Sequence, residues 1–283
     1  MKVFKIDLYE HFGVKKPENG AGTLTCYILD NSREVNPERK KPAMLVIPGG
    51  GYGMTSFREE EPVAVKYLSY GYNAFMLEYS VAPVRHPYQL AEAVMAMNYI
   101  RLTAGETGTD PAMVAAVGFS AGGHLCAMLG SIFDSEDIKP VFTPSVSARP
   151  DAVILSYPVI TYGEKSHNDS FDNLCGDNEE LKKSLAADKL VNKNSSPAFI
   201  WATRNDGCVP VRSSLAIAAA YEENELNFSI HVFGQGWHGL SLADKTVYGA
   251  IYDEVEKQLS TDVSYWVDMS VNWLKEQGIF VKD

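Results

Sequence analysis

The sequence lacks any hydrophobic run long enough to cross a membrane. No segment approaches the roughly 18 consecutive apolar residues that a membrane-spanning helix needs. The first ten residues alternate apolar and charged side chains, and they contain no apolar core of the kind found in secretory signal peptides. We therefore expect a cytoplasmic protein with no membrane partner.

Cysteine is scarce, and basic residues are outnumbered by acidic ones. The four cysteines lie far apart, with no C-x-x-C pair and no metal-ligand spacing, so we expect reduced thiols and no bound metal. The 25 Lys and Arg residues against 36 Asp and Glu residues give a net charge of −11. Because this charge repels phosphate backbones and anionic lipids, we expect neither nucleic acid nor a membrane surface as a partner.

Motifs for nucleotides and catalytic metals are also missing. There is no phosphate-binding loop ending in Lys-Ser or Lys-Thr and no H-E-x-x-H helix. A dinucleotide-binding G-x-G-x-x-G pattern starting at Gly49 fails, because Met54 stands where its third glycine is required. We therefore expect no cofactor.

What the sequence does contain is an alternation of short apolar runs with longer helical patterns. This alternation predicts an α/β protein whose mostly parallel sheet of about eight strands is flanked by crossover helices. The predicted strands are 1–10, 24–30, 43–47, 73–79, 113–117, 151–156, 198–203 and 227–233, and the predicted helices are 59–70, 88–103, 120–129, 211–223 and 259–277.

The chain is expected to form a single domain over residues 1–283 with one insertion. Residues 161–196 are polar and rich in Asn, Ser and Lys, and they lie between two predicted strands. A connection of this length is usually functional, so we interpret it as a small lid-like insertion with a short helix near 178–190.

The strongest chemical signal is the pentapeptide Gly118-Phe119-Ser120-Ala121-Gly122. An apolar strand precedes it and a helix of small and apolar residues follows it, which is the setting of a nucleophile elbow. The glycines permit a tight turn that exposes the Ser120 hydroxyl at a helix N-terminus, where negative charge is favoured. The alternative is that Ser120 only caps the helix.

A serine nucleophile needs a base, and six histidines are available. His238 lies in the glycine-rich loop 234–239 after the final predicted strand, which gives it freedom to reach Ser120. His124 is fixed on the same helix as Ser120, His231 alternates within a predicted strand, and His11 falls in a predicted edge strand. We therefore predict His238 as the base, with a surface-loop histidine as the alternative.

The orienting acid is predicted at Asp206. It follows the strand 198–203, at the sheet edge where ligands collect in α/β proteins. The order Ser120, Asp206, His238 is the chain order of α/β-hydrolases. Asp172 and Asp177 in the insertion are the competing acids.

Backbone donors for an oxyanion are predicted on two loops. The sequence Pro48-Gly49-Gly50-Gly51-Tyr52 follows the strand 43–47 directly, and glycine allows backbone to approach a substrate closely. We predict Gly50 and Gly51 as donors on this loop, together with Ala121 after the nucleophile. The aromatic rings of Tyr52 and Trp237 are candidate substrate contacts.

Together these stretches resemble the α/β-hydrolase esterase/lipase family, near the bacterial acetyl xylan esterase-like carbohydrate esterases. The matching segments are PGGGY at 48–52, GFSAGGHL at 118–125, TRNDGCVP at 203–210 and GWHGL at 236–240. Pro48 replaces the histidine of the H-G-G-G motif of hormone-sensitive-lipase-like enzymes, which favours the carbohydrate-esterase branch. The resemblance implies Ser120 as nucleophile, His238 as base, Asp206 as its partner, and Gly50, Gly51 and Ala121 as oxyanion donors.

The function that follows is a serine carboxylesterase acting on short acyl esters through an acyl-enzyme on Ser120. Acetyl esters of carbohydrates such as xylo-oligosaccharides are the leading substrates, so the expected partner is a small-molecule or oligosaccharide ester. An amide hydrolase of the same fold (an acylpeptide-type peptidase or an arylformamidase) and a non-catalytic binding module remain alternatives. The sequence leaves open whether the chain forms a homo-oligomer.

Overall fold

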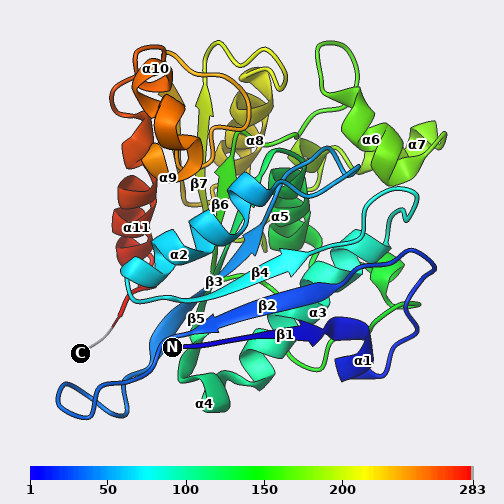
Figure 1. The fold of residues 1–283 in the computed structure, drawn as a ribbon. Coiled ribbons are helices and arrows are strands. Elements are labelled where there is room, and N and C mark those ends of the chain that lie inside the picture. Colours follow the sequence, from blue (N-terminus) through cyan, green and yellow to red (C-terminus); the bar gives the residue numbers. More distant parts are fainter. Residues whose placement is uncertain (282–283) are drawn as a thin grey trace.

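The computed structural model describes residues 1–281 and is built on one eight-stranded sheet (Figure 1). The strand order is β1-β2-β4-β3-β5-β6-β7-β8. The β1–β2 and β2–β4 pairs are antiparallel, and every other neighbouring pair is parallel. The strands are β1 (Lys2–Asp7), β2 (Thr23–Ile28), β3 (Lys41–Ile47), β4 (Asn73–Glu78), β5 (Thr109–Phe119), β6 (Ala152–Ser156), β7 (Ala198–Thr203) and β8 (Phe228–Phe233).

The parallel strands β3, β6 and β7 are buried on both faces, which explains their nearly continuous apolar sequences, whereas the edge strand β8 is only partly buried. Successive side chains of a strand point to opposite faces. In β3, Leu45 and Ile47 belong to the apolar core on one face, whereas Met44 and Val46 belong to the core on the other. The sheet therefore carries two hydrophobic cores.

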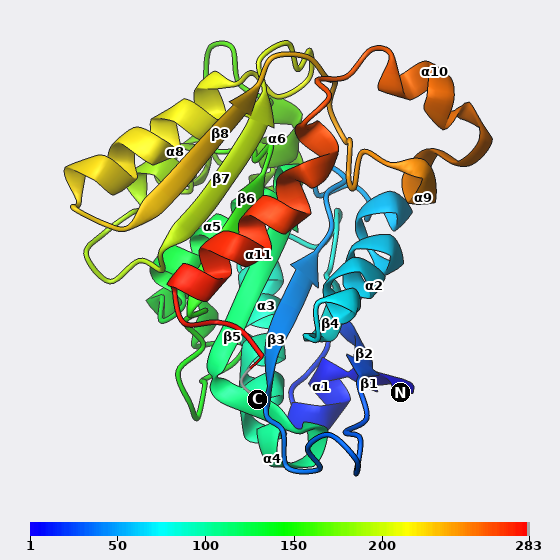
Figure 2. The same cartoon turned by 90° about the vertical axis from the view of Figure 1, so that its left-hand side faces the viewer.

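Helices cover both faces (Figure 2). The first core packs under α3 (Tyr88–Leu102), α5 (Ser120–Ile132) and α8 (Arg212–Glu223). The second packs under α2 (Glu61–Ser69) and α11 (Trp266–Glu276), where the Trp266 ring stacks on Trp201 at 5.1 Å between centroids. The predicted α/β class and mostly parallel sheet of about eight strands are confirmed.

The first strand is shorter than predicted. Asp7 accepts hydrogen bonds from the N–H groups of Tyr9 and Glu10, and it thereby caps a helix, α1 (Leu8–Phe12), that ends at the left-handed Gly13. Placing His11 in an edge strand was therefore wrong. The local capping interaction overrides the alternating pattern.

The last predicted helix begins too early. Helix α11 starts at Trp266, and the residues before it form the 3-10 turn η5 (Val263–Tyr265). The short helical segments α9 (Lys245–Tyr248), η4 (Gly249–Ile251) and α10 (Tyr252–Glu256) were not predicted, because elements of three to five residues are too short to show helical periodicity. The same reason hides α4 (Ala104–Thr107), η1 (Phe57–Glu59) and η2 (Glu136–Ile138).

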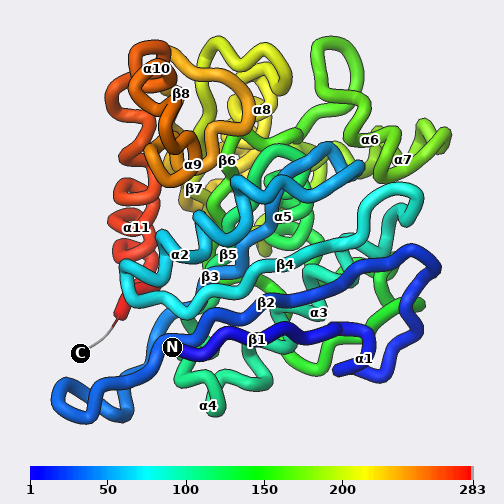
Figure 3. Tube along the Cα trace, in the orientation of Figure 1, coloured from blue at the N-terminus to red at the C-terminus, as the bar shows by residue number. Residues whose placement is uncertain are grey.

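The segment 161–196 holds more helix than predicted. It contains α6 (Asn168–Cys175), α7 (Glu179–Ser184) and η3 (Ala187–Lys189). The helix predicted near 178–190 is in fact divided into α7 and η3, and α6 was not predicted. Asn178 caps α7 by accepting from the Leu181 N–H. Figures 1 and 3 show α6–α7 and α9–α10 at the same end of the sheet, where β3, β6 and β7 end. Within residues 1–281, no helix is both long and apolar enough to cross a membrane.

Candidate active site

Ser120 occupies a tight turn between β5 and α5. Its φ is +52°, a left-handed conformation that a non-glycine residue rarely adopts. A Cβ at Gly118 would lie 2.2 Å from the carbonyl oxygen of Gly122, and one at Gly122 would lie 2.2 Å from that of Pro48. Only glycine fits at these two positions, so the packing around the turn holds Ser120 in its strained conformation.

His238 connects Ser120 to Asp206. Its Nε2 lies 2.7 Å from Ser120 Oγ, and its Nδ1 lies 2.7 Å from Asp206 Oδ2. The Asp206 side chain is fully buried, and its other oxygen accepts from the N–H groups of Cys208 and Val209 at 2.8 and 2.9 Å. Because the carboxylate can only accept, the Nδ1–H donates to it and Nε2 is left to accept the serine proton.

The competing histidine on α5 has a structural position. His124 is buried, its Nε2–H donates to the Leu185 carbonyl at 2.7 Å, and its Nδ1 accepts from the Tyr52 hydroxyl at 2.8 Å. Burial lowers the pKa of His124 to about 4, so the ring stays neutral. His231 stacks on Phe199 instead of facing the site.

The competing acids lie elsewhere. Asp172 forms an ion pair with Lys182 inside the insertion, and Asp177 is exposed. The structure therefore brings Ser120, His238 and Asp206 together and leaves both insertion acids outside this hydrogen-bonded set.

A cavity of about 370 Å³ opens beside Ser120 and His238. The predicted donors Gly50 and Gly51 line it, with φ values of +128° and +64°. The N–H of the neighbouring Gly49 is already committed, because it donates to Glu59 Oε2 at 2.8 Å. Ala121 is the first residue after the nucleophile in α5, so its N–H is one of the unpaired donors at that helix end.

Tyr52 does not reach the cavity, contrary to the expectation that it contacts substrate. It is 1% exposed, its hydroxyl bonds to His124, and its ring packs edge-on against Tyr79. Burying this large aromatic ring in the core stabilises the fold more than leaving it exposed in the cavity would. Trp237 is half-buried with its ring against Tyr248 and is not among the cavity-lining residues, so its role stays a prediction.

The cavity has further walls that sequence reasoning missed. They come from three places: the loop and turn before α2, the start of the insertion, and the loop after β7. No sequence motif marks these residues, although Arg58 and Glu59 follow the glycine loop closely. They are Met54, Ser56, Arg58, Glu59, His167 and Cys208.

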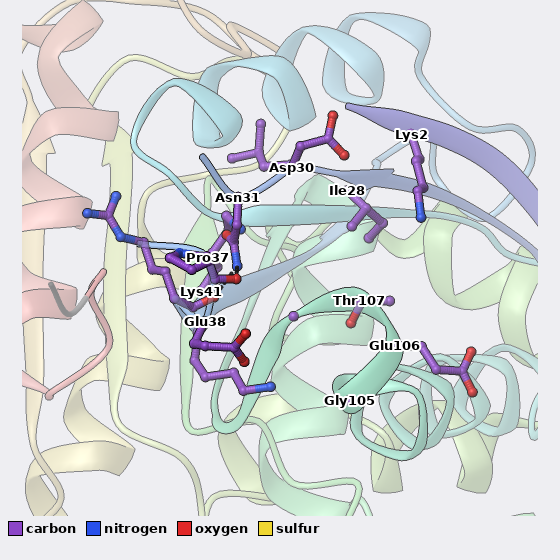
Figure 4. A pocket seen from close by; sticks show the side chains of 14 residues that line it. Lys2, Ile28, Asp30, Asn31, Pro37, Glu38, Lys41, Gly105, Glu106 and Thr107 are labelled. Atoms are coloured by element: carbon purple, nitrogen blue, oxygen red, sulfur yellow. Dashed lines mark hydrogen bonds between the residues drawn. The ribbon is translucent and has the colours of Figure 1, made fainter. Parts of the chain in front are cut away.

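A second cavity, of about 240 Å³, lies far from this site (Figure 4). It is formed by the ends of β2 and β3 and the turn at α4, and Lys2, Asp30, Lys41 and Glu106 line it. Within the part of the chain that the structure describes, no three His, Cys, Asp or Glu side chains gather in a way that could hold a metal ion.

The chain matches the BD-FAE family model over residues 29–221. It is 40% identical over 217 residues to endo-1,4-beta-xylanase B of Butyrivibrio fibrisolvens, a match that covers 74% of this chain and 34% of that protein. It is 25% identical over 283 residues to the acetylxylan esterase of Xylanibacter ruminicola, covering 95% of this chain and 52% of that protein. The chain thus spans only part of the length of these relatives.

Two solved structures are similar over nearly their whole length. The acetyl ester-xyloside bifunctional hydrolase from Caldicellulosiruptor lactoaceticus has 35% identity and a TM-score of 0.82, with 98% of this chain and 97% of that one covered. A carboxylesterase from Lactobacillus plantarum has 26% identity and a TM-score of 0.82, with 100% of both chains covered.

These matches agree with the nucleophile-elbow geometry, and they confirm the esterase-like resemblance seen in the sequence. The chain belongs to the BD-FAE family, a hydrolase family, and has the α/β-hydrolase fold.

Proposed function

We propose that this chain is a serine carboxylesterase that hydrolyses short-chain acyl esters through an acyl-enzyme on Ser120. The observation that carries the proposal is His238, which bridges the Ser120 hydroxyl and the buried Asp206 carboxylate beside a cavity. A nucleophile, a base and an orienting acid in hydrogen-bonding reach are the parts that acyl transfer needs.

In the first half of the proposed reaction, His238 Nε2 takes the proton of Ser120 as Oγ attacks the ester carbonyl. The carbonyl oxygen becomes negative and accepts from the N–H groups of Gly50, Gly51 and Ala121. Asp206 stabilises the imidazolium that forms and keeps its Nδ1–H directed inward. His238 then protonates the departing alcohol oxygen.

In the second half, His238 removes a proton from water, and the resulting hydroxide attacks the acyl-enzyme. The tetrahedral species collapses, the acid leaves, and the proton returns to Ser120. All steps use side chains and backbone of this chain, without a metal or an organic cofactor.

We propose acetylated carbohydrates such as xylo-oligosaccharides as substrates. Support comes from the names of the relatives, an acetylxylan esterase and a xylanase, and from the acetyl ester-xyloside hydrolase among the similar structures. Polar side chains in the cavity wall, such as Arg58, Ser56 and His167, suit a hydroxyl-rich substrate.

The insertion 161–196 is proposed as a lid of a single domain that comprises the chain. Two contacts support this role. His167 lines the cavity, and Asn173 Nδ2 on α6 donates to the Gly51 carbonyl at 2.9 Å. The segment thereby connects directly to the loop that supplies two oxyanion donors. For the compartment we propose the cytoplasm, which suits the four unpaired cysteines.

The two alternative functions, an amide hydrolase and a binding module, predict different activities. An amide hydrolase of this fold would favour acyl amides over the matching esters, and a binding module would show no turnover. Comparing p-nitrophenyl acetate, acetylated xylo-oligosaccharides and an acyl anilide under the same conditions separates the three functions.

The central test is Ser120→Ala. We expect kcat on p-nitrophenyl acetate to fall by roughly 10⁴–10⁶-fold with the fold intact, because a helix-start hydroxyl contributes at most about 1 kcal/mol to stability. Wild-type protein should react with a fluorophosphonate probe, and the variant should not. A folded variant that retains activity within tenfold of wild type would refute the proposal.

A further inference from the structure

We infer that Glu59 is a positioning residue of the active site, coupling the oxyanion loop to the loop that carries His238. This inference rests on the proposed function and adds a second buried carboxylate to it. Glu59 is only 3% exposed, yet it lines the cavity that contains Ser120 and His238.

On one side, Glu59 holds the glycine loop. Its Oε2 accepts from the Gly49 N–H at 2.8 Å, and the Ser56 N–H in turn donates to the Gly49 carbonyl at 3.0 Å. A Cβ at Gly49 would meet Glu59 Oε2 at 2.7 Å and Ser120 Cβ at 2.9 Å, so the carboxylate and the nucleophile flank the same glycine. Gly50 and Gly51 follow directly, so the orientation of their N–H groups depends on the hydrogen bond between Gly49 and Glu59.

On the other side, Glu59 reaches the histidine loop through Tyr157. The Tyr157 hydroxyl donates to Glu59 Oε1 at 2.6 Å and accepts from the Ser241 N–H at 2.9 Å. The Tyr157 ring packs edge-on against His238, with 5.1 Å between centroids. Ser241 follows His238 by three residues, and its hydroxyl donates to the Arg58 carbonyl. Glu59, Tyr157 and Ser241 are therefore joined by hydrogen bonds next to His238.

The hydrogen bonds indicate that Glu59 is ionised. Because the Tyr157 oxygen already accepts from Ser241, its proton is free to donate to Glu59, and Gly49 donates to the other carboxyl oxygen. Among the residues that the structure describes, two donors and no acceptor form hydrogen bonds with the group, which is the environment of a carboxylate. Burial raises the pKa of Glu59, while these two hydrogen bonds and the nearby His238 and Arg58 oppose the rise.

The charged groups around Glu59 are few. Arg58 and Glu60 adjoin it in the chain, and His238 faces it from the loop after β8. Tyr157, Tyr79 and Tyr248 face it from other elements, and burial raises the pKa of each, so they stay neutral. A negative Glu59 therefore favours the imidazolium of His238 that develops as Ser120 attacks.

The test compares Glu59→Gln with Glu60→Gln. The amide that Glu59→Gln introduces preserves the size of the side chain and can still accept from Gly49. Its NH2 group then faces the Tyr157 oxygen, so the substitution removes the charge and reverses one hydrogen bond. Glu60 is a matched control, because it is also buried (8% exposed), adjoins Glu59 and does not line the cavity. Thermal unfolding confirms that both variants fold.

The first readout is the NMR titration of the His238 ring, assigned by its loss in His238→Gln. We expect its midpoint to lie at lower pH in Glu59→Gln than in the wild type, because the variant lacks the negative charge that favours the imidazolium, and to stay unchanged in Glu60→Gln. A purely structural role for Glu59 would not move it. An unchanged midpoint in a folded Glu59→Gln variant would overturn the inference, whatever the protein hydrolyses.

The second readout is turnover of p-nitrophenyl acetate. In Glu59→Gln we expect kcat to fall about 10- to 100-fold with little change in KM, and the acidic limb of the pH–rate profile to follow the NMR shift. Glu60→Gln should stay within twofold of wild type. If the wild type shows no hydrolysis but the NMR shift is present, the proposed function fails and the coupling by Glu59 stands.

Discussion

At the scale of single residues, backbone geometry and hydrogen bonding place the atoms that we propose to react. Ser120 is held at positive φ because glycines on both sides allow the close approach of neighbouring backbone. The two N–H groups after Asp206 point its carboxylate at His238. Each group is therefore oriented before a substrate arrives, which reduces the reorganisation that the reaction requires.

The role of Asp206 leads to a prediction about tautomers. In Asp206→Asn the side-chain shape is kept, but the amide can donate to His238 Nδ1 and so favours the tautomer with its proton on Nε2. The same change in a serine protease lowers kcat by about 10⁴, and we expect a loss of that order here. Steady-state kinetics on p-nitrophenyl acetate measures it.

Asp172→Asn and Asp177→Asn serve as controls, because one acid pairs with Lys182 and the other is exposed. Both should retain kcat, with a change in KM only if the insertion contacts substrate. If Asp206→Asn kept full activity and Asp177→Asn lost it, the acid that orients His238 would be Asp177 of the insertion and not Asp206.

At the scale of elements, helix α5 carries more than the proposed nucleophile Ser120. His124 lies one helical turn after Ser120 and joins the oxyanion-loop residue Tyr52 to Leu185 of the insertion. Both ring nitrogens are used, one as donor and one as acceptor, which is the arrangement of a neutral ring. Protonating it would reverse the hydrogen bond with Tyr52 and turn the tyrosine proton away, and burial disfavours the charged ring.

This geometry predicts a pH-dependent contribution to stability. The pKa of His124 is lowered to about 4 in the fold against 6.5 in the unfolded chain. The unfolded state therefore binds a proton first as the pH falls, and the contribution of His124, fully present above pH 6.5, is lost toward pH 4. Between pH 7 and 5 the loss is about 2 kcal/mol.

Urea unfolding at several pH values tests this contribution in His124→Gln. The variant should be less stable than wild type at pH 7, and the difference should shrink by about 2 kcal/mol at pH 5. The exposed His11, changed to Gln, should leave the wild-type pH dependence intact. A constant difference between His124→Gln and wild type would mean that His124 is not kept neutral by the fold.

Among the secondary-structure elements, the sequence predicted those with a repeating hydrophobic pattern and missed the short ones that depend on local interactions. The strands were predictable because buried parallel strands are short, continuous apolar runs, as in residues 43–47 of β3. Helices α1, α9 and α10 were not, because each has only four or five residues, and α1 and α9 begin at the caps Asp7 and Asp244. Periodicity cannot reveal one turn of helix.

The site shows the same division. The sequence could predict that Ser120, Asp206 and His238 lie together, because each follows a strand in a recognisable motif and such loops meet at one sheet edge. Glu59 was missed because its function depends on contacts with Gly49 and Tyr157, which lies 98 positions along the chain. A carboxylate that is buried against residues distant in the sequence leaves no local pattern by which it can be recognised.

At the scale of the whole molecule, the sheet and its insertions combine to form a small open cavity whose wall has both apolar and polar surface. The loops after β3, β7 and β8 supply most of the walls, and the start of the insertion adds His167. Met54 is the one large apolar side chain among the cavity-lining residues of the described chain. This composition bears directly on which acyl groups fit.

We therefore predict that acetyl esters are preferred over octanoyl esters by at least tenfold in kcat/KM. In an apolar groove, each of the six additional methylenes of octanoyl would contribute roughly 0.8 kcal/mol of binding, which would favour the longer chain. Although the exposed wall is mostly carbon, that carbon is divided among glycine backbone, Met54 and residues with polar ends such as Arg58 and His167. The additional methylenes therefore gain less than in an apolar groove, and they crowd a cavity of about 370 Å³. A series of p-nitrophenyl esters from acetyl to octanoyl measures the trend, with Ser120→Ala as the background rate. Rates that rise steadily with chain length would indicate a lipase-like groove, formed by a displacement of the insertion, and would remove the basis for acetylated carbohydrates as substrates.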